Sequence, residues 1–97
     1  MSAKVQELLN FIASMGGRYS EWYVGIATDP QVRLFDQHRV SKMAGQWIYI
    51  PCESSEVARL VEAHFIGLGT MGGSGGGDYA TKFVYAYRIT PYTIQTA

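Results

Sequence analysis

The chain has 97 residues, with eight basic and eight acidic side chains and no net charge. This length suffices for one domain with a single core, and we expect residues 1–97 to form it. Zero net charge argues against a protein held on nucleic acid by a global positive field, but allows a local basic patch. A single cysteine and a start unlike a signal peptide predict a cytoplasmic protein with no membrane partner.

An amphipathic helix is expected over residues 3–14. Its apolar side chains recur at the spacing of one helical stripe: Val5, Leu8, Leu9 and Ile12. Gly16-Gly17 would end this helix. We expect it to cover one face of a sheet and to carry no chemistry.

A strand followed by a helix is expected over residues 22–39. Along 22–28, bulky apolar residues alternate with Tyr23, Gly25 and Ala27. Gly25 would let another group approach the strand closely. Thr28 and Asp29 suit a helix cap, and Pro30 suits the first helical position, so a helix should run from Pro30 to about Arg39.

A second strand, 47–50, is expected to end at Pro51 on a sheet edge, and a helix capped by Ser54 or Ser55 should follow. This helix has a predicted buried stripe of Val57, Leu60, Val61, Phe65 and Leu68. Glu62 falls on the flank of the stripe, and His64 falls near its middle, as a hydrogen-bonded core histidine would.

Residues 67–77 include seven glycines. They follow a helix, whereas a dinucleotide fingerprint follows a strand, so we predict either a mobile flap or a plain connector. A third strand, 83–89, should place its tyrosines on one face, and the tail after Pro91 should be frayed. The fold class is α+β, a small three-stranded sheet flanked by helices.

The residues limit the chemistry. Nothing in the sequence marks Cys52 as an activated thiol, and one cysteine with two histidines is too few for zinc at these separations. A set that suits phosphodiester cleavage remains. Glu62 can hold Mg²⁺, Arg33 can stabilise charge on the phosphate, and a tyrosine or His38 can handle the attacking water.

Two segments resemble the GIY-YIG nuclease superfamily. Tyr23-Val24-Gly25, Thr28-Asp29-Pro30 and Arg33-Leu34 are similar to the second half of its signature. Trp47 to Ile50 and Ser55 to Ile66 are similar to its later strand and glutamate-bearing helix. The resemblance covers roughly residues 19–68, and it implies a GIY-YIG-like core at about 19–90 within the domain. It implies a divalent-metal-dependent endonuclease that uses Mg²⁺ or Mn²⁺ and acts on nucleic acid, with DNA expected rather than RNA.

By this resemblance the catalytic residues are Tyr23, Arg33, His38 and Glu62, with Glu62 as the metal ligand. Arg39 and Lys42 are candidates for contacts with the nucleic-acid backbone. His38 follows Arg33 by five residues, one more than the spacing associated with the family. In a regular α-helix the extra residue would rotate its side chain by about 100°.

The chain also departs from the family pattern. It lacks a clear Gly-Ile-Tyr motif before Tyr23, the expected helix 3–14 occupies that region, and Tyr79-Ala80 stands where Tyr-Asn is expected. Tyr19 is the only tyrosine upstream. We therefore predict that strand 83–89 fills the empty sheet position, with Tyr85 or Tyr87 replacing the missing tyrosine. The alternative is a catalytically inactive module that binds nucleic acid or a protein.

Overall fold

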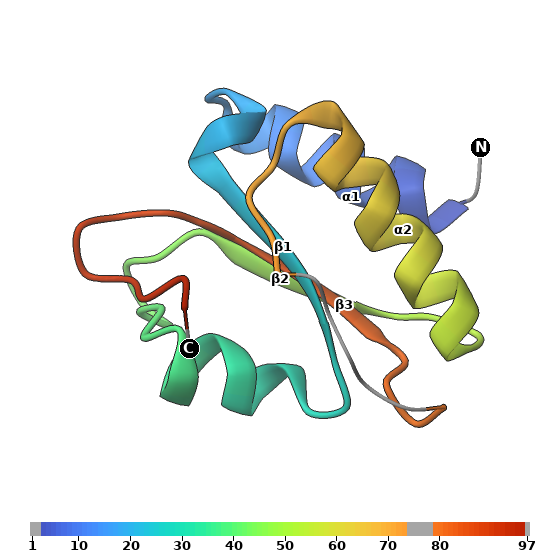
Figure 1. The fold of residues 1–97 in the computed structure, drawn as a ribbon. Helices are drawn as coiled ribbons and strands as arrows, with labels where there is room; N and C mark the ends of the chain where they lie inside the picture. The colour runs from blue at the N-terminus through green and yellow to red at the C-terminus, as the bar shows by residue number, and fades with distance from the viewer. Residues whose placement is uncertain (1–2, 74–78, 97) are drawn as a thin grey trace.

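The computed structural model describes residues 3–73 and 79–96. A three-stranded sheet has helices on both faces (Figure 1). The elements, in chain order, are α1 (Ala3–Met15), η1 (Tyr19–Glu21), β1 (Trp22–Ala27), η2 (Val32–Gln37), β2 (Trp47–Pro51), α2 (Ser55–Leu68) and β3 (Phe83–Arg88). The predicted α+β class is confirmed.

The last strand in the sequence is the central strand of the sheet. The order is β1-β3-β2, and β3 runs antiparallel to both neighbours. The registers place Tyr85 opposite both Gly25 and Tyr49. The C-terminal strand β3 therefore lies between β1 and β2, both of which precede it by many residues in the sequence. Pro51 ends an edge strand, as predicted, because an edge can accommodate a missing N–H donor.

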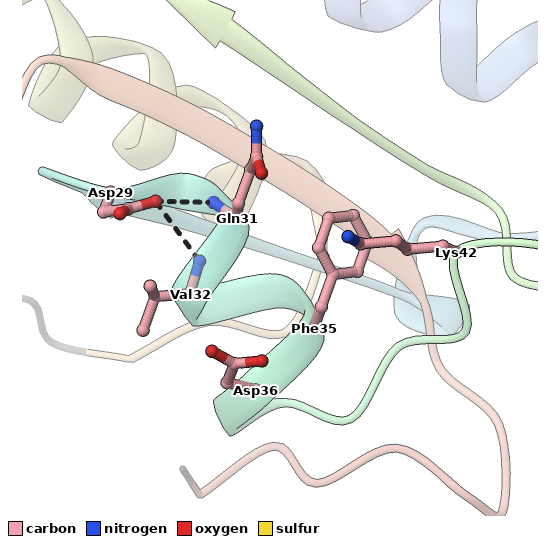
Figure 2. A pocket seen from close by; sticks show the side chains of 6 residues that line it. All are labelled: Asp29, Gln31, Val32, Phe35, Asp36 and Lys42. Atoms are coloured by element: carbon pink, nitrogen blue, oxygen red, sulfur yellow. Dashed lines mark hydrogen bonds between the residues drawn. The ribbon is translucent and has the colours of Figure 1, made fainter.

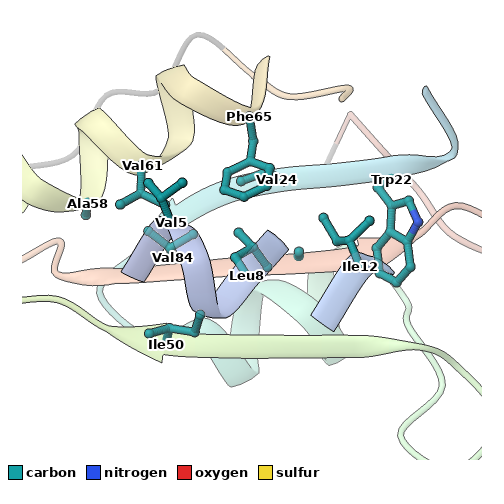
Figure 3. Packing of buried hydrophobic residues seen from close by; sticks show 11 residues of the cluster. Val5, Leu8, Ile12, Trp22, Val24, Ile50, Ala58, Val61, Phe65 and Val84 are labelled. Atoms are coloured by element: carbon teal, nitrogen blue, oxygen red, sulfur yellow. The ribbon is translucent and has the colours of Figure 1, made fainter. Parts of the chain in front are cut away.

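One face of the sheet forms the first core, beneath α1 and α2 (Figure 3). Trp22 and Val24 of β1 point to this face, as do Val84 and Ala86 of β3. The alternation predicted for both strands is confirmed. The predicted N-terminal helix is also confirmed, and its buried residues are Val5, Leu8 and Ile12.

The opposite face forms a second core, beneath η2. It contains Tyr23, Leu34, Tyr85 and Tyr87, and the half-buried Phe35 packs against it. The helical segment begins at Pro30, and the Asp29 carboxylate accepts hydrogen bonds from the N–H groups of Gln31 and Val32 at 3.1 and 3.3 Å. The predicted cap is therefore present, and the second core carries most of the candidate site residues.

The outer edge of β1 is partly covered by the chain that leaves α2. Met71 donates to the carbonyl of Trp22 at 2.8 Å and accepts from the N–H of Val24 at 3.0 Å. Gly72 lies so close that a Cβ atom there would approach the carbonyl oxygen of Val24 to 2.8 Å. The part of the predicted flap at residues 74–77 lies outside the described residues.

The buried face of α2 differs from the predicted stripe. Leu60 is 70% exposed and His64 is exposed, so the expectation of a core histidine is wrong. Leu68 is also largely exposed, whereas Val61 and Phe65 are buried as predicted. Ser55, Ala58 and Glu62 are buried in addition. Because small side chains lie on the buried face, the helix is rotated about its axis relative to the prediction. Glu62 therefore lies on the buried face and not on its flank.

The C-terminal tail, for which fraying is predicted, contacts the rest of the fold at Ile94. The Ile94 N–H donates to the carbonyl of His38 at 2.8 Å. Figure 1 shows this end of the chain beside the end of η2. Among the described residues, no helix has the length and apolar character needed to cross a membrane.

Candidate active site

A π-helix brings Arg33 and His38 onto one side of η2. The His38 N–H donates to the carbonyl of Arg33, five residues earlier, at 2.8 Å. The wider turn absorbs the extra residue, because a π-helix joins residues five apart by a backbone hydrogen bond and so brings them onto the same side. The Arg33 guanidinium is therefore 3.4 Å from His38 Nε2. The 100° rotation expected for a regular α-helix does not occur.

The partners of the His38 ring define its tautomer. Nδ1 is 2.6 Å from the carbonyl oxygen of Ile94, which can only accept a hydrogen bond, so Nδ1 carries the proton. Nε2 is 2.8 Å from the Tyr85 hydroxyl and faces the Arg33 guanidinium, which can only donate. Neutral Nε2 is therefore an acceptor, and the Tyr85 hydroxyl donates to it.

Three tyrosines lie around this histidine. The ring of Tyr23 stacks on the rings of Tyr85 and Tyr87, with centroids 6.2 and 5.1 Å apart. The centroids of Tyr23 and His38 are 4.7 Å apart, and the Tyr87 hydroxyl is 3.1 Å from His38 Nδ1. Tyr23 comes from β1, His38 follows η2, and the other two tyrosines come from β3. The structure thus assembles Tyr23, His38, Tyr85 and Tyr87, joined by Arg33, into one cluster.

Gly25 makes this cluster sterically possible. A Cβ atom at position 25 would lie 2.6 Å from both Cζ and the hydroxyl oxygen of Tyr85. The close approach predicted at this glycine is therefore made by the phenol of the opposing strand. Only glycine leaves room for Tyr85 to lie across β1.

Burial favours the neutral forms of His38, Tyr85 and Tyr87. It lowers the pKa of His38, and the adjacent Arg33 charge lowers it further, although the bond to Ile94 opposes this shift. Burial also raises the pKa values of Tyr85 and Tyr87 well above the ordinary value for tyrosine. The phenols therefore hold their protons at neutral pH. Any proton that Tyr85 accepts must be matched by one that it passes to His38.

Glu62 lies on the buried face of α2, the helix that covers the first core, whereas the tyrosines of the cluster belong to the second core. The charge of Glu62 is the smallest of the influences that raise the pKa of Tyr85, of which burial is the largest. The residue is 8% exposed, and burial raises its own pKa, with an opposing effect from Arg59. Residues 3–73 and 79–96 contain no group of three or more His, Cys, Asp or Glu side chains placed to hold a metal ion. A single carboxylate still fits Mg²⁺, which commonly binds proteins through one or two carboxylates, with water and phosphate completing its shell.

The other candidate residues lie outside this cluster. Tyr19 packs against the first core, so it does not supply the missing tyrosine. Lys42 is exposed, and its Nζ lies 4.8 Å from the centroid of the Phe35 ring. It lines a hollow of about 350 Å³ on η2 together with Asp29 and Asp36 (Figure 2). Arg39 is exposed, has a φ of 62°, and lines a smaller hollow of about 190 Å³ beside the tail.

Two contributions to the site were not predicted from the sequence. Ile94 acts through its backbone, which no residue pattern indicates. Gln37 accepts a hydrogen bond from the Arg33 guanidinium and orients it. The spacing of four between these two residues could have indicated this pair, because such side chains are neighbours on a regular helix.

No protein-family model matches the chain, and no match was found among curated proteins or solved structures. The fold and the cluster define an α+β protein with a buried tyrosine–histidine cluster, a partly buried arginine beside it and a buried carboxylate on α2.

Proposed function

We propose that the chain is a divalent-metal-dependent endonuclease of the GIY-YIG type, in which the C-terminal strand supplies the tyrosine that the first motif lacks. The observation that carries the proposal is the hydrogen bond from Tyr85 on the central strand to His38, beside Arg33. Tyr23, Arg33 and His38, which the resemblance implies are catalytic, therefore lie beside Tyr85 from the C-terminal strand. Nucleic acid, with DNA expected before RNA, is the substrate class.

The hydrogen bonds support a proton relay. The oxygen of Tyr85 can accept a proton from the attacking water while its own proton passes to His38 Nε2. The carbonyl of Ile94 then stabilises the imidazolium through Nδ1–H. This order avoids a free tyrosinate, which the raised pKa of Tyr85 disfavours. The relay follows the logic of a nucleophile, a histidine and an orienting acceptor.

Charge on the phosphate would be met by Arg33, which is only partly buried. Glu62 would hold Mg²⁺ or Mn²⁺, and the ion would supply Lewis-acid stabilisation of the phosphate oxygens. Arg39 and Lys42 are both exposed near η2 and would contact the nucleic-acid backbone without reading its sequence.

The test is cleavage of branched, nicked and single-stranded DNA and RNA by purified protein with Mg²⁺ or Mn²⁺. We expect cleavage that Glu62→Ala and Arg33→Ala each lower by at least about 100-fold. The exposed residues Glu7 and Arg18 give matched controls, and Glu7→Ala and Arg18→Ala should cut like wild type. Cleavage that both site variants retain would refute the proposal.

A second candidate is a nuclease-like domain that binds nucleic acid or a protein without cutting. The burial of His38, Tyr85 and Tyr87 favours it, because a substrate must reach the relay at the margin of the cluster. Salt-sensitive binding without cleavage of any substrate would identify this module, and absence of nucleic-acid binding would direct the search to a protein partner.

A further inference from the structure

We propose that the C-terminal tail is a positioning element of the candidate site, and that the backbone of Ile94 holds His38 in the tautomer that can receive a proton from Tyr85. The catalytic consequence rests on the proposed nuclease function. The tautomer itself is a property of the protein without substrate.

The contact is made twice by one residue. The Ile94 N–H donates to the backbone carbonyl of His38 at 2.8 Å, and its carbonyl accepts from His38 Nδ1 at 2.6 Å. Ile94 is 43% exposed, and its two contacts with His38 are made by its backbone N–H and carbonyl. The tail thus fixes both the main chain and the ring of His38.

A turn after β3 delivers Ile94 to this position. The Thr93 N–H donates to the carbonyl of Thr90 at 3.2 Å, and the Thr90 N–H donates to the Thr93 hydroxyl at 3.0 Å. The Tyr92 N–H donates to the Thr90 hydroxyl at 3.2 Å. These bonds reverse the chain and bring it back over the end of η2 (Figure 1).

The tautomer decides whether the relay can operate. The hydrogen bond at one ring nitrogen sets which nitrogen carries the proton. With Nδ1–H donated to Ile94, the lone pair of Nε2 faces Tyr85. A neutral histidine side chain in water favours the Nε2–H form, which would present a donor to the Tyr85 hydroxyl and to the Arg33 guanidinium. Loss of the tail should therefore remove the acceptor from the relay.

The experiment measures the His38 tautomer by long-range ¹H–¹⁵N correlation, together with DNA cleavage in Mg²⁺. The test variant ends at Thr93, and the matched control ends at Gln95 and keeps Ile94. Ile94→Ala tests the side chain. Ile94→Pro removes the N–H donor at full length and also restricts the backbone of residues 93 and 94, so the Ile94 carbonyl loses the bond that anchors it beside His38. Amide spectra of α1 and α2 report whether each variant is folded.

We expect the Nδ1–H form in the full chain, in the Gln95 truncation and in Ile94→Ala. The Thr93 truncation should show Nε2–H and cut about 10- to 100-fold more slowly. Ile94→Pro should shift the tautomer in the same direction, because without the N–H bond to the His38 carbonyl the Ile94 carbonyl is no longer held against Nδ1. Nε2–H in the full chain overturns the inference, as does Nδ1–H in a folded Thr93 truncation. If that truncation is unfolded, an unchanged tautomer in Ile94→Pro overturns it. If the Thr93 truncation switches to Nε2–H but the full chain itself cuts no substrate, the positioning role is supported and the nuclease function is refuted.

Discussion

Gly25→Ala tests the claim that the site depends on a gap in β1. The new Cβ would lie 2.6 Å from Tyr85, whereas ordinary contacts begin at 3.4 Å, so the phenol must move by about 0.8 Å. Tyr85 is 1% exposed and lies on the central strand, so it has little room to move. Overpacking of this kind costs about 1–3 kcal/mol, more than the roughly 0.5–1 kcal/mol gained by removing a strand glycine.

The assay is urea unfolding, with His38 ring shifts as a local probe. Gly25→Ala should unfold at lower urea and change the His38 signals, because its partner Tyr85 is displaced. Gly67→Ala is the matched control, because its Cβ would meet nothing within 4 Å and alanine favours the helix. That control should be as stable as wild type or more stable. If Gly25→Ala matched wild type in both stability and His38 shifts, the steric reasoning would be refuted.

Three further predictions concern the elements that hold the site. Asp29→Ala should lower the free energy of unfolding by about 1 kcal/mol, because the helix cap is lost. The control Asp36→Ala, at an exposed position, should change it by less than about 0.5 kcal/mol. Urea unfolding midpoints compare the two variants, and equal losses would contradict the capping role of Asp29. Deleting Asp36 should convert the π-helix to an α-helix and keep the hydrogen bond between Tyr85 and His38. The His38 ring shifts report this bond. Its loss would contradict the claim that the π-helix accommodates the five-residue spacing between Arg33 and His38. Glu62→Gln should stabilise the protein at pH 7, because burial raises the pKa of Glu62 above 4.5. The wild-type stability linked to this group is present below pH 4.5 and is lost as pH rises through the folded pKa. A gain that persisted unchanged at pH 4 would contradict that sign.

The fold was predictable where local patterns act alone. Alternation gave the faces of β1 and β3, and the caps at Asp29 and Ser54 were both expected. Gly25 indicated a close approach, although not the partner. These features depend on residues a few positions apart, for which side-chain period and turn chemistry suffice.

The remaining features depend on contacts distant in the sequence. The periodicity of β3 cannot reveal that it is the central strand, because period two is the same at a centre and at an edge. The rotation of α2 was missed because Ser55 and Ala58 face the sheet while Leu60 faces solvent. The π-helix and the backbone contact of Ile94 with His38 have no composition signal, and both arise from tertiary packing.

The most direct test of the whole account is single-turnover cleavage by Tyr85→Phe and Tyr49→Phe. The two residues lie opposite each other in the sheet, but Tyr85 donates to His38, whereas Tyr49 accepts from Gln31. We predict that Tyr85→Phe cuts at least about 100-fold more slowly and that Tyr49→Phe cuts like wild type. Equal rates for Tyr85→Phe and wild type would contradict the claim that the C-terminal strand completes a nuclease site.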